Sequence, residues 1–158
     1  MKTVVSEKDL EEMFYDNYVE HYLIEQSNGL RERSFSSKIF TSQANFREFY
    51  VDDLYIGFGD LNLKQPIDIC FESGQTHIQM AFVFSGEIFV KYGRSREEIR
   101  IGQNQHNLLF LSEEEKVSGV RADEKNQLKI MDISLTPKLF TQFFPENSSV
   151  FFPSYGTK

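Results

Sequence analysis

A run of eight residues near the middle of the chain carries the side chains best suited to binding chemistry. Residues 77–84 read His-Ile-Gln-Met-Ala-Phe-Val-Phe, and a glycine lies a few positions from either end. This enrichment in β-branched and aromatic residues between glycines predicts a strand. Alternation along the strand groups two polar and two small apolar side chains on one face, namely His77, Gln79, Ala81 and Val83.

The opposite face of this strand is wholly apolar, with Ile78, Met80, Phe82 and Phe84. A strand buried on both faces lies in the wall of a barrel or sandwich, with one face directed at the lumen. Two polar groups on an inner wall suit a cavity for a small ligand. They equally suit the solvated end of a core strand, and the residues alone leave both interpretations open. Tyr92, on the next expected strand, is a further candidate for the same cavity.

Familiar catalytic arrangements are missing from the sequence. There is neither a G-x-S-x-G elbow nor a phosphate-binding P-loop. Cys70 has no recognisable histidine partner and is interpreted as a small core residue. Asp52 and Asp53 are adjacent, so a strand would point their carboxylates to opposite faces. His21 and His106 are expected on the surface or in turns, so none of these residues predicts an active site.

Composition narrows the class of protein. The chain has 158 residues, 16 of them Phe, and no Trp, which suits one domain with a substantial core. Its formal net charge of -7 argues against binding a phosphate backbone. The single cysteine excludes a disulfide within one chain and favours a reducing compartment. The N-terminus lacks an apolar signal core, and no apolar run approaches the roughly 18 residues of a membrane span. We therefore expect a soluble, cytoplasmic protein.

Short strands spaced about every ten residues predict an all-β sandwich or barrel. Without helices between them, a parallel sheet with crossover helices is not expected. Residues 31–39 are expected to form an edge strand, and Gly57 to Asp60 to turn the chain. The expected division is an N-terminal extension over 1–26, with a short helix from Ser6, then a β-barrel over 27–135 and a C-terminal helix and tail over 136–158.

The C-terminal helix is predicted from Thr136 to Phe144. Thr136 is a good N-cap, and Pro137 suits the first turn. Its apolar stripe is too large to face water, so it packs on the barrel or on another chain. The stripe consists of Leu139, Phe140, Phe143 and Phe144.

Three segments carry a resemblance to a known family. HIQMAFVFSGE, QHNLLFL and MDISLTPKLF, within residues 50–144, resemble a cupin half-barrel and the sensor half of AraC-type transcription regulators. The resemblance implies an all-β, cupin-like double-stranded β-helix barrel with a short N-terminal helix and a C-terminal helix.

The same resemblance argues against a catalytic metal. Metal-binding cupin enzymes carry a His pair and a Glu before the turn glycine, here Gly86. The Glu place falls on Gln79, and the His places fall within residues 72–75, where there is no His. The last His place falls near Val117 or Ser118. Because a transition-metal site needs three or more converging ligands, the resemblance implies no metal, no cofactor and no turnover.

The resemblance also implies a function and partners. A sensor half binds a small-molecule effector, contacts DNA only through a separate helix-turn-helix domain that this chain lacks, and pairs through the helix after the barrel. We therefore expect a homodimer with Phe140 or Phe143 at the contact, while the rest of the stripe docks inward. A stand-alone cupin-fold enzyme with an atypical metal site, or a small-lipid carrier barrel, stays open as an alternative.

Overall fold

The computed structural model describes residues 18–26, 28–39, 42–64, 67–69, 76–92, 98–111, 117–122 and 127–144. The strands are β1 (Tyr18–Glu25), β2 (Arg31–Ile39), β3 (Ser42–Val51), β4 (Leu54–Asn62), β5 (Ile67–Ile69), β6 (His77–Ser85), β7 (Ile88–Tyr92), β8 (Glu98–Ile101), β9 (Gln105–Leu111), β10 (Val117–Ala122) and β11 (Gln127–Leu135), and the helix is α2 (Pro137–Phe143). The helix expected from Ser6, the residue Cys70 and the tail after Phe144 lie outside the described residues.

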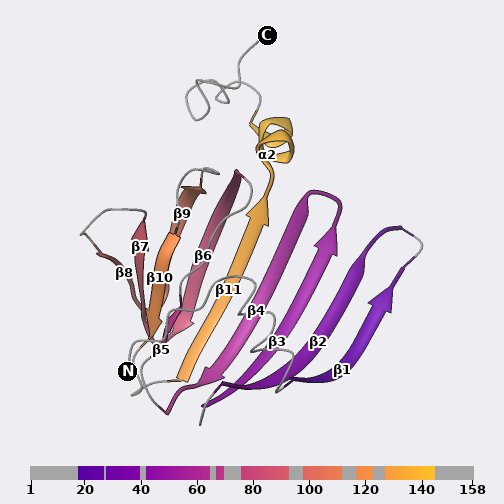
Figure 1. Ribbon diagram of the computed structural model, residues 1–158. Coiled ribbons are helices and arrows are strands. Elements are labelled where there is room, and N and C mark those ends of the chain that lie inside the picture. Colours follow the sequence, from indigo (N-terminus) through magenta and orange to yellow (C-terminus); the bar gives the residue numbers. More distant parts are fainter. Residues whose placement is uncertain are drawn as a thin grey trace.

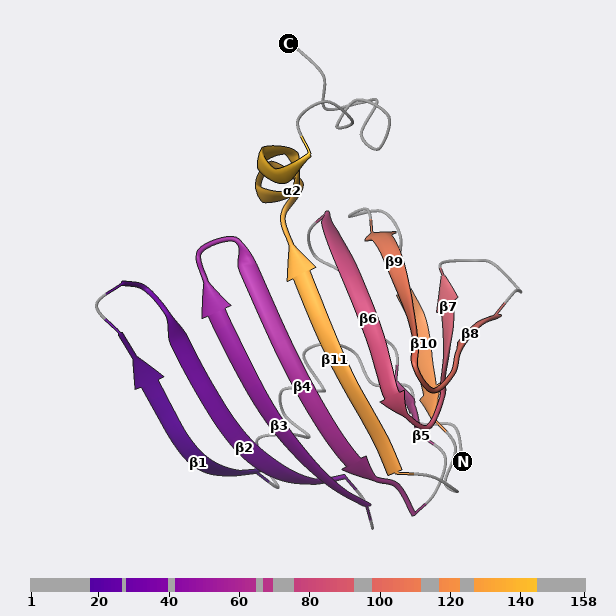
Figure 2. The ribbon, with the colours of Figure 1, turned by 180° about the vertical axis from the view of Figure 1, so that it is seen from behind.

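Strands β4 to β11 form a jelly roll. One sheet contains the order β4-β11-β6-β9, and the other has the order β5-β10-β7-β8 (Figures 1 and 2). All paired neighbours run antiparallel. An eight-stranded, two-sheet arrangement of this kind is the architecture of cupins. The expected all-β, cupin-like fold is therefore confirmed.

Strands β1 to β3 extend the first sheet beyond β4, giving it seven strands. They form an antiparallel meander, in which β2 pairs with β1 on one side and β3 on the other. The expectation that residues 31–39 form an edge strand is wrong, because β1 covers that edge. Residues 18–25, which lie in the expected N-terminal extension, form a strand that is hydrogen-bonded into the same sheet as the barrel strands.

Strand β4 runs without a break through the glycines expected to turn the chain. Its pairing with β11 is continuous from Leu54 to Asn62. The actual turn is at Asp52, whose φ is 45°, and it joins β3 to β4 as a hairpin. Gly57 and Gly59 lie within this strand. Glycine suits both positions because other side chains fill the space where a Cβ atom would lie. Glycine in a strand often marks such a close approach.

The Ser85-Gly86-Glu87 segment joins β6 to β7, but the two strands do not form a hairpin. It carries the chain from one sheet to the other, since β6 pairs with β9 and β11 while β7 pairs with β8 and β10. Gly86 has a φ of 81°, and a Cβ there would lie 3.2 Å from the carbonyl oxygen of Gln127. Glycine is therefore the residue that suits this position.

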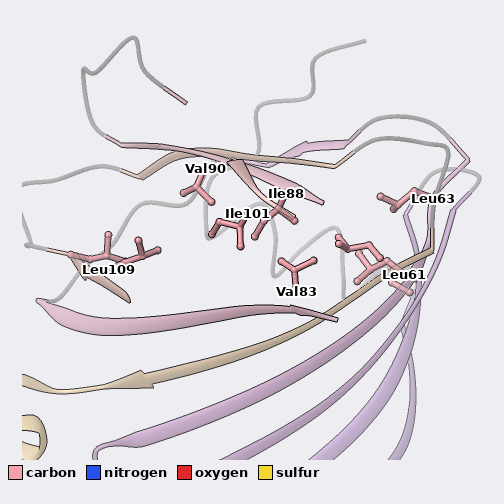
Figure 3. Close-up of a cluster of buried hydrophobic side chains, with 10 residues drawn as sticks. Leu61, Leu63, Val83, Ile88, Val90, Ile101 and Leu109 are labelled. Atoms are coloured by element: carbon pink, nitrogen blue, oxygen red, sulfur yellow. The ribbon is translucent and has the colours of Figure 1, made fainter. Parts of the chain in front are cut away.

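The main core fills the space between the two sheets. Figure 3 shows Val83 and Leu109 facing Val90 and Ile101 across this space. We call the side of the seven-stranded sheet that carries Val83 the inner face, and the opposite side the outer face. The remaining buried members of the core are Ala44, Leu61, Leu63, Ile88, Leu111 and Leu128.

Helix α2 packs on the outer face, at the end of β11 (Figure 1). Its side chain Phe140 lies with Ile78 and Leu135 in a second buried cluster. Thr136 caps the helix, because its Oγ1 accepts a hydrogen bond from the Leu139 N–H at 3.2 Å. The expected helix and its cap are confirmed, with Pro137 in the first turn.

Candidate functional site

A polar cluster lies on the inner face of the seven-stranded sheet. Residues directly opposite one another on antiparallel strands share a face. Val83 is opposite Ile130, so Ala81, opposite Asp132, and Gln79, opposite Ser134, continue the same face along β6 and β11. The face continues onto β4 and β3. Gly57 and then Glu48 extend the row of Asp132, and Tyr55 and then Tyr50 extend the row of Ser134.

Asp132 is the centre of this cluster. Gln79 Nε2 donates a hydrogen bond to Asp132 Oδ2 at 2.9 Å, and Ser134 Oγ lies 3.5 Å from the same oxygen. Oδ1 is buried and has no hydrogen-bond partner among the described residues. Burial raises the pKa of Asp132, and the Gln79 hydrogen bond, the charge of His77 and the Ser134 hydroxyl oppose that rise.

Two tyrosines and a glutamate form the neighbouring half of the cluster. Tyr50 Oη donates to Glu48 Oε2 at 2.9 Å, and Tyr55 Oη donates to Glu48 Oε1 at 3.3 Å. The two rings lie 5.0 Å apart between centroids. Burial, followed by the charge of Glu48, raises the pKa of both phenols well above the ordinary value. Both hydroxyls therefore stay protonated near neutral pH and remain committed to Glu48 as donors.

Glycines in β4 make room for these side chains. A Cβ at Gly57 would lie 2.8 Å from Tyr55 Cζ, so the Tyr55 ring occupies the space over Gly57. At Gly59 a Cβ would lie 3.0 Å from Leu61 Cδ1 and 3.1 Å from Ile130 Cγ1. The first glycine thus lets an aromatic ring lie across the sheet beside Asp132, which is directly opposite Gly57.

Arginines continue the inner face beyond the tyrosines. Arg33 is opposite Glu48 and Arg31 is opposite Tyr50 across the β2–β3 pairing. The Arg31 guanidinium carbon lies 5.3 Å from the Tyr50 ring centroid, and that of Arg33 lies 4.8 Å from the Phe35 centroid. Both distances allow cation–π attraction. The cluster is therefore basic at its β2 end and acidic at its β11 end.

The residues predicted from the sequence divide between this cluster and the core. Gln79 donates a hydrogen bond to Asp132, and the charge of His77 acts to lower the pKa of Asp132. Ala81 packs against the main core, and Val83 is a fully buried member of it. Tyr92 lies in β7, but its side chain is outside the described part of the chain. Whether any of them contacts a ligand stays a prediction.

Sequence reasoning missed five members of the cluster: Glu48, Tyr50, Tyr55, Asp132 and Ser134. Alternation along β11 already placed the last two on one face, opposite Ile133. Alternation alone could not identify the cluster, because no local sequence pattern predicts that β11 lies between β4 and β6.

The described residues contain no group of three His, Cys, Asp or Glu side chains arranged to hold a metal ion. Residues 72–75, where the resemblance places cupin ligands, and the side chains of Val117 and Ser118 are outside the described part. Among the same described residues, no helix is both long and apolar enough to cross a membrane.

The residues of the apolar stripe on α2 differ in burial: the first two are packed in the domain and the last two are exposed. Phe140 is 5% exposed and belongs to the outer-face core, with Leu139 packed against the same cluster. Phe143 is 67% exposed and Phe144 is 50% exposed. Of the two residues expected at a dimer contact, Phe140 is buried inside its own domain and Phe143 is exposed, and the contact itself stays a prediction.

Solved structures similar to this chain include cupins and an ethanolamine utilisation protein. An ethanolamine utilisation protein Q from Salmonella typhimurium is 8% identical, with a TM-score of 0.45, over 75% of this chain and 94% of that one. The Schizosaccharomyces pombe Cnp3 cupin domain is 10% identical, with a TM-score of 0.43, over 84% and 92%. An RmlC-like cupin from Desulfovibrio desulfuricans is 13% identical, with a TM-score of 0.41, over 78% and 86%. These likenesses concern the fold alone.

No curated protein matches the sequence significantly. A family match does exist, and it covers well over half of the chain. Residues 43–154, from β3 to beyond α2, match the family described as the regulatory protein PchR N-terminal domain. This agrees with the expected resemblance to the sensor half of AraC-type regulators. The chain therefore belongs to the PchR N-terminal regulatory domain family.

Proposed function

We propose that this regulatory domain senses a small-molecule effector that binds on the inner face, at the cluster around Asp132. The observation that carries the proposal is the buried Oδ1 of Asp132, which has no partner among the described residues. Leaving a buried acceptor unsatisfied costs about 1–3 kcal/mol, and more for a charged group. A polar group kept at such a cost is typical of a functional site.

The surrounding residues support binding rather than turnover. Gln79 binds the Asp132 carboxylate through Oδ2, and Oδ1 has no hydrogen-bond partner among the described residues. Glu48 holds the hydroxyls of both Tyr55 and Tyr50, and of the two rings that of Tyr55 is the one on β4, next to the strand of Asp132. A few placed polar groups next to an apolar core are typical of small-molecule sites. On this proposal the domain acts in the cytoplasm and has no catalytic role.

We also propose that the domain pairs with a second copy of itself through the end of α2. Phe143 and Phe144 support this, because both are large apolar side chains that lie at least half exposed on adjacent positions. Soluble monomers seldom leave such groups uncovered, and a two-fold pair buries the same patch from both chains. DNA contact would then belong to a separate helix-turn-helix domain.

Equilibrium dialysis against a low-molecular-mass cell extract tests effector binding. Mass spectrometry of the retained fraction should show a compound that the wild-type protein enriches and that Tyr55→Leu and Asp132→Asn do not. Asp60→Asn is the matched control, because Asp60 is paired with Lys129 outside the cluster. Equal enrichment by all four proteins, or none by any, would contradict the proposal.

A further inference from the structure

The hydrogen bonds of the cluster converge on its two carboxylates. Both tyrosine hydroxyls donate to Glu48, and the Gln79 amide donates to Asp132 Oδ2. The atom without a hydrogen-bond partner among the described residues is an acceptor, the buried Oδ1 of Asp132. A ligand that completes this arrangement must bring a donor to that oxygen.

The two carboxylates of the cluster, Asp132 on β11 and Glu48 on β3, differ in their pairing from other carboxylates of the domain. Neither Asp132 nor Glu48 forms an ion pair with a described residue, although other carboxylates do, such as Glu32 with Arg47 and Glu87 with Arg100. An ionised, partly buried carboxylate is normally paired. Of the basic groups near the cluster, His77 is the one whose charge acts on Asp132.

The nearby arginines, Arg31 and Arg33, lie at the β2 end of the cluster, away from Asp132. Arg33 and Asp132 are in one cross-strand row, with Glu48 and Gly57 between them. Three strand spacings of roughly 4.8 Å separate their backbones by about 14 Å, and the Arg33 guanidinium lies over the Phe35 ring. Arg31 lies over the Tyr50 ring rather than toward β11. A cation is therefore disfavoured beside Tyr50 and favoured beside Asp132.

We infer that the effector carries a protonated nitrogen, which donates to Asp132 Oδ1 and lies beside the ring of Tyr55. This inference deepens the proposed function and rests on it. A charge-assisted hydrogen bond is roughly twice as strong as a neutral one, so a cationic donor uses this oxygen better than a hydroxyl does. The Tyr55 ring, which lies over Gly57 opposite Asp132, adds cation–π attraction. The net charge of -7 favours the approach of a cation.

Three probes that differ mainly in their terminal group test this inference: 2-phenylethylammonium, 2-phenylethanol and 3-phenylpropanoate. Titration calorimetry at neutral pH gives their dissociation constants, and NMR signals of the Gln79 amide and the Tyr55 ring locate the site. The ammonium should bind at least about tenfold more tightly than the alcohol, and the carboxylate should be weakest. Asp132→Asn should reduce ammonium affinity to that of the alcohol, while Asp60→Asn should leave it unchanged.

The outcomes separate the ligand class from the site itself. The alcohol or the carboxylate could bind as tightly as the ammonium and lose that binding in Tyr55→Leu. This result would overturn the cationic class of ligand and keep the site. An ammonium preference that survives in Asp132→Asn also overturns the inference. If no probe shifts the Gln79 or Tyr55 signals, the cationic class falls, and the dialysis result then decides whether the proposed site falls with it.

Discussion

Gln79 and Asp132 are 53 positions apart in the sequence and are joined by a 2.9 Å hydrogen bond on the inner face of the sheet. Their strands, β6 and β11, are neighbours in the jelly roll. The bond is diagonal, because Gln79 is directly opposite Ser134 and Asp132 is opposite Ala81. Diagonal neighbours on one face are within reach of long side chains, and the Gln79 amide uses that reach.

Removing only one partner of this bond should destabilise the fold. Gln79→Leu takes the donor from a buried carboxylate, and we expect a loss of about 1–3 kcal/mol in the free energy of unfolding. Gln79→Leu with Asp132→Leu should lose less than Gln79→Leu alone, because no unsatisfied carboxylate remains. Urea unfolding measures both. Gln142→Leu, at an exposed position, is the control. A double variant that is less stable than Gln79→Leu alone would argue against the bond.

The pH dependence of stability should report the buried carboxyl. Burial raises the folded-state pKa of Asp132 above its ordinary value, so the native state binds more protons than the unfolded state in that range. Stability should therefore fall as pH rises from the unfolded pKa through the folded one, by up to about 1.4 kcal/mol per pH unit.

Asp132→Asn removes this titration and keeps the shape of the side chain. The variant should gain stability relative to wild type as pH rises, and the two should approach each other in acid. Urea unfolding between acid and neutral pH checks this, with Asp60→Asn as the control. A constant difference across the range would show that Asp132 does not titrate within it.

Gly57→Ala should displace Tyr55. The added methyl would overlap the Tyr55 ring, so the ring must move away from Glu48. We expect a cost of about 1–3 kcal/mol, typical of overpacking. In a Tyr55→Ala background the same substitution should cost clearly less. Equal costs in both backgrounds, measured by urea unfolding, would mean that the ring is not what excludes a side chain at this position.

The two halves of the α2 stripe should behave differently. Phe140→Ala opens a cavity against Ile78 and Leu135, and it should cost about 3–5 kcal/mol of stability. Phe143→Glu should leave stability almost unchanged and dissociate the dimer, because this side chain is exposed. Sedimentation velocity and urea unfolding separate these effects, with the exposed Gln142→Glu as the charge-matched control. A monomeric wild type, or a dimer that survives Phe143→Glu, would contradict the pairing.

The sequence by itself determined the elements that depend on local chemistry. Alternation in residues 77–84 predicted strand β6 and its inner-face residues Gln79 and Val83. Thr136 and Pro137 predicted where α2 begins, because capping involves only neighbouring residues. The turn expected at Gly57 was wrong, since a glycine in a strand is explained by the side chain that covers it, here Tyr55.

Only the tertiary structure decided which strands are neighbours, and the cluster depends on that. Asp132, Tyr55 and Glu48 come from strands β11, β4 and β3, and no local pattern relates β11 to the other two. The order β3-β4-β11-β6 arises because the jelly roll inserts its last strand between β4 and β6. Strand pairing over such sequence distances is set by burial of the shared core, so the partner of Gln79 could not be read from the residues around it.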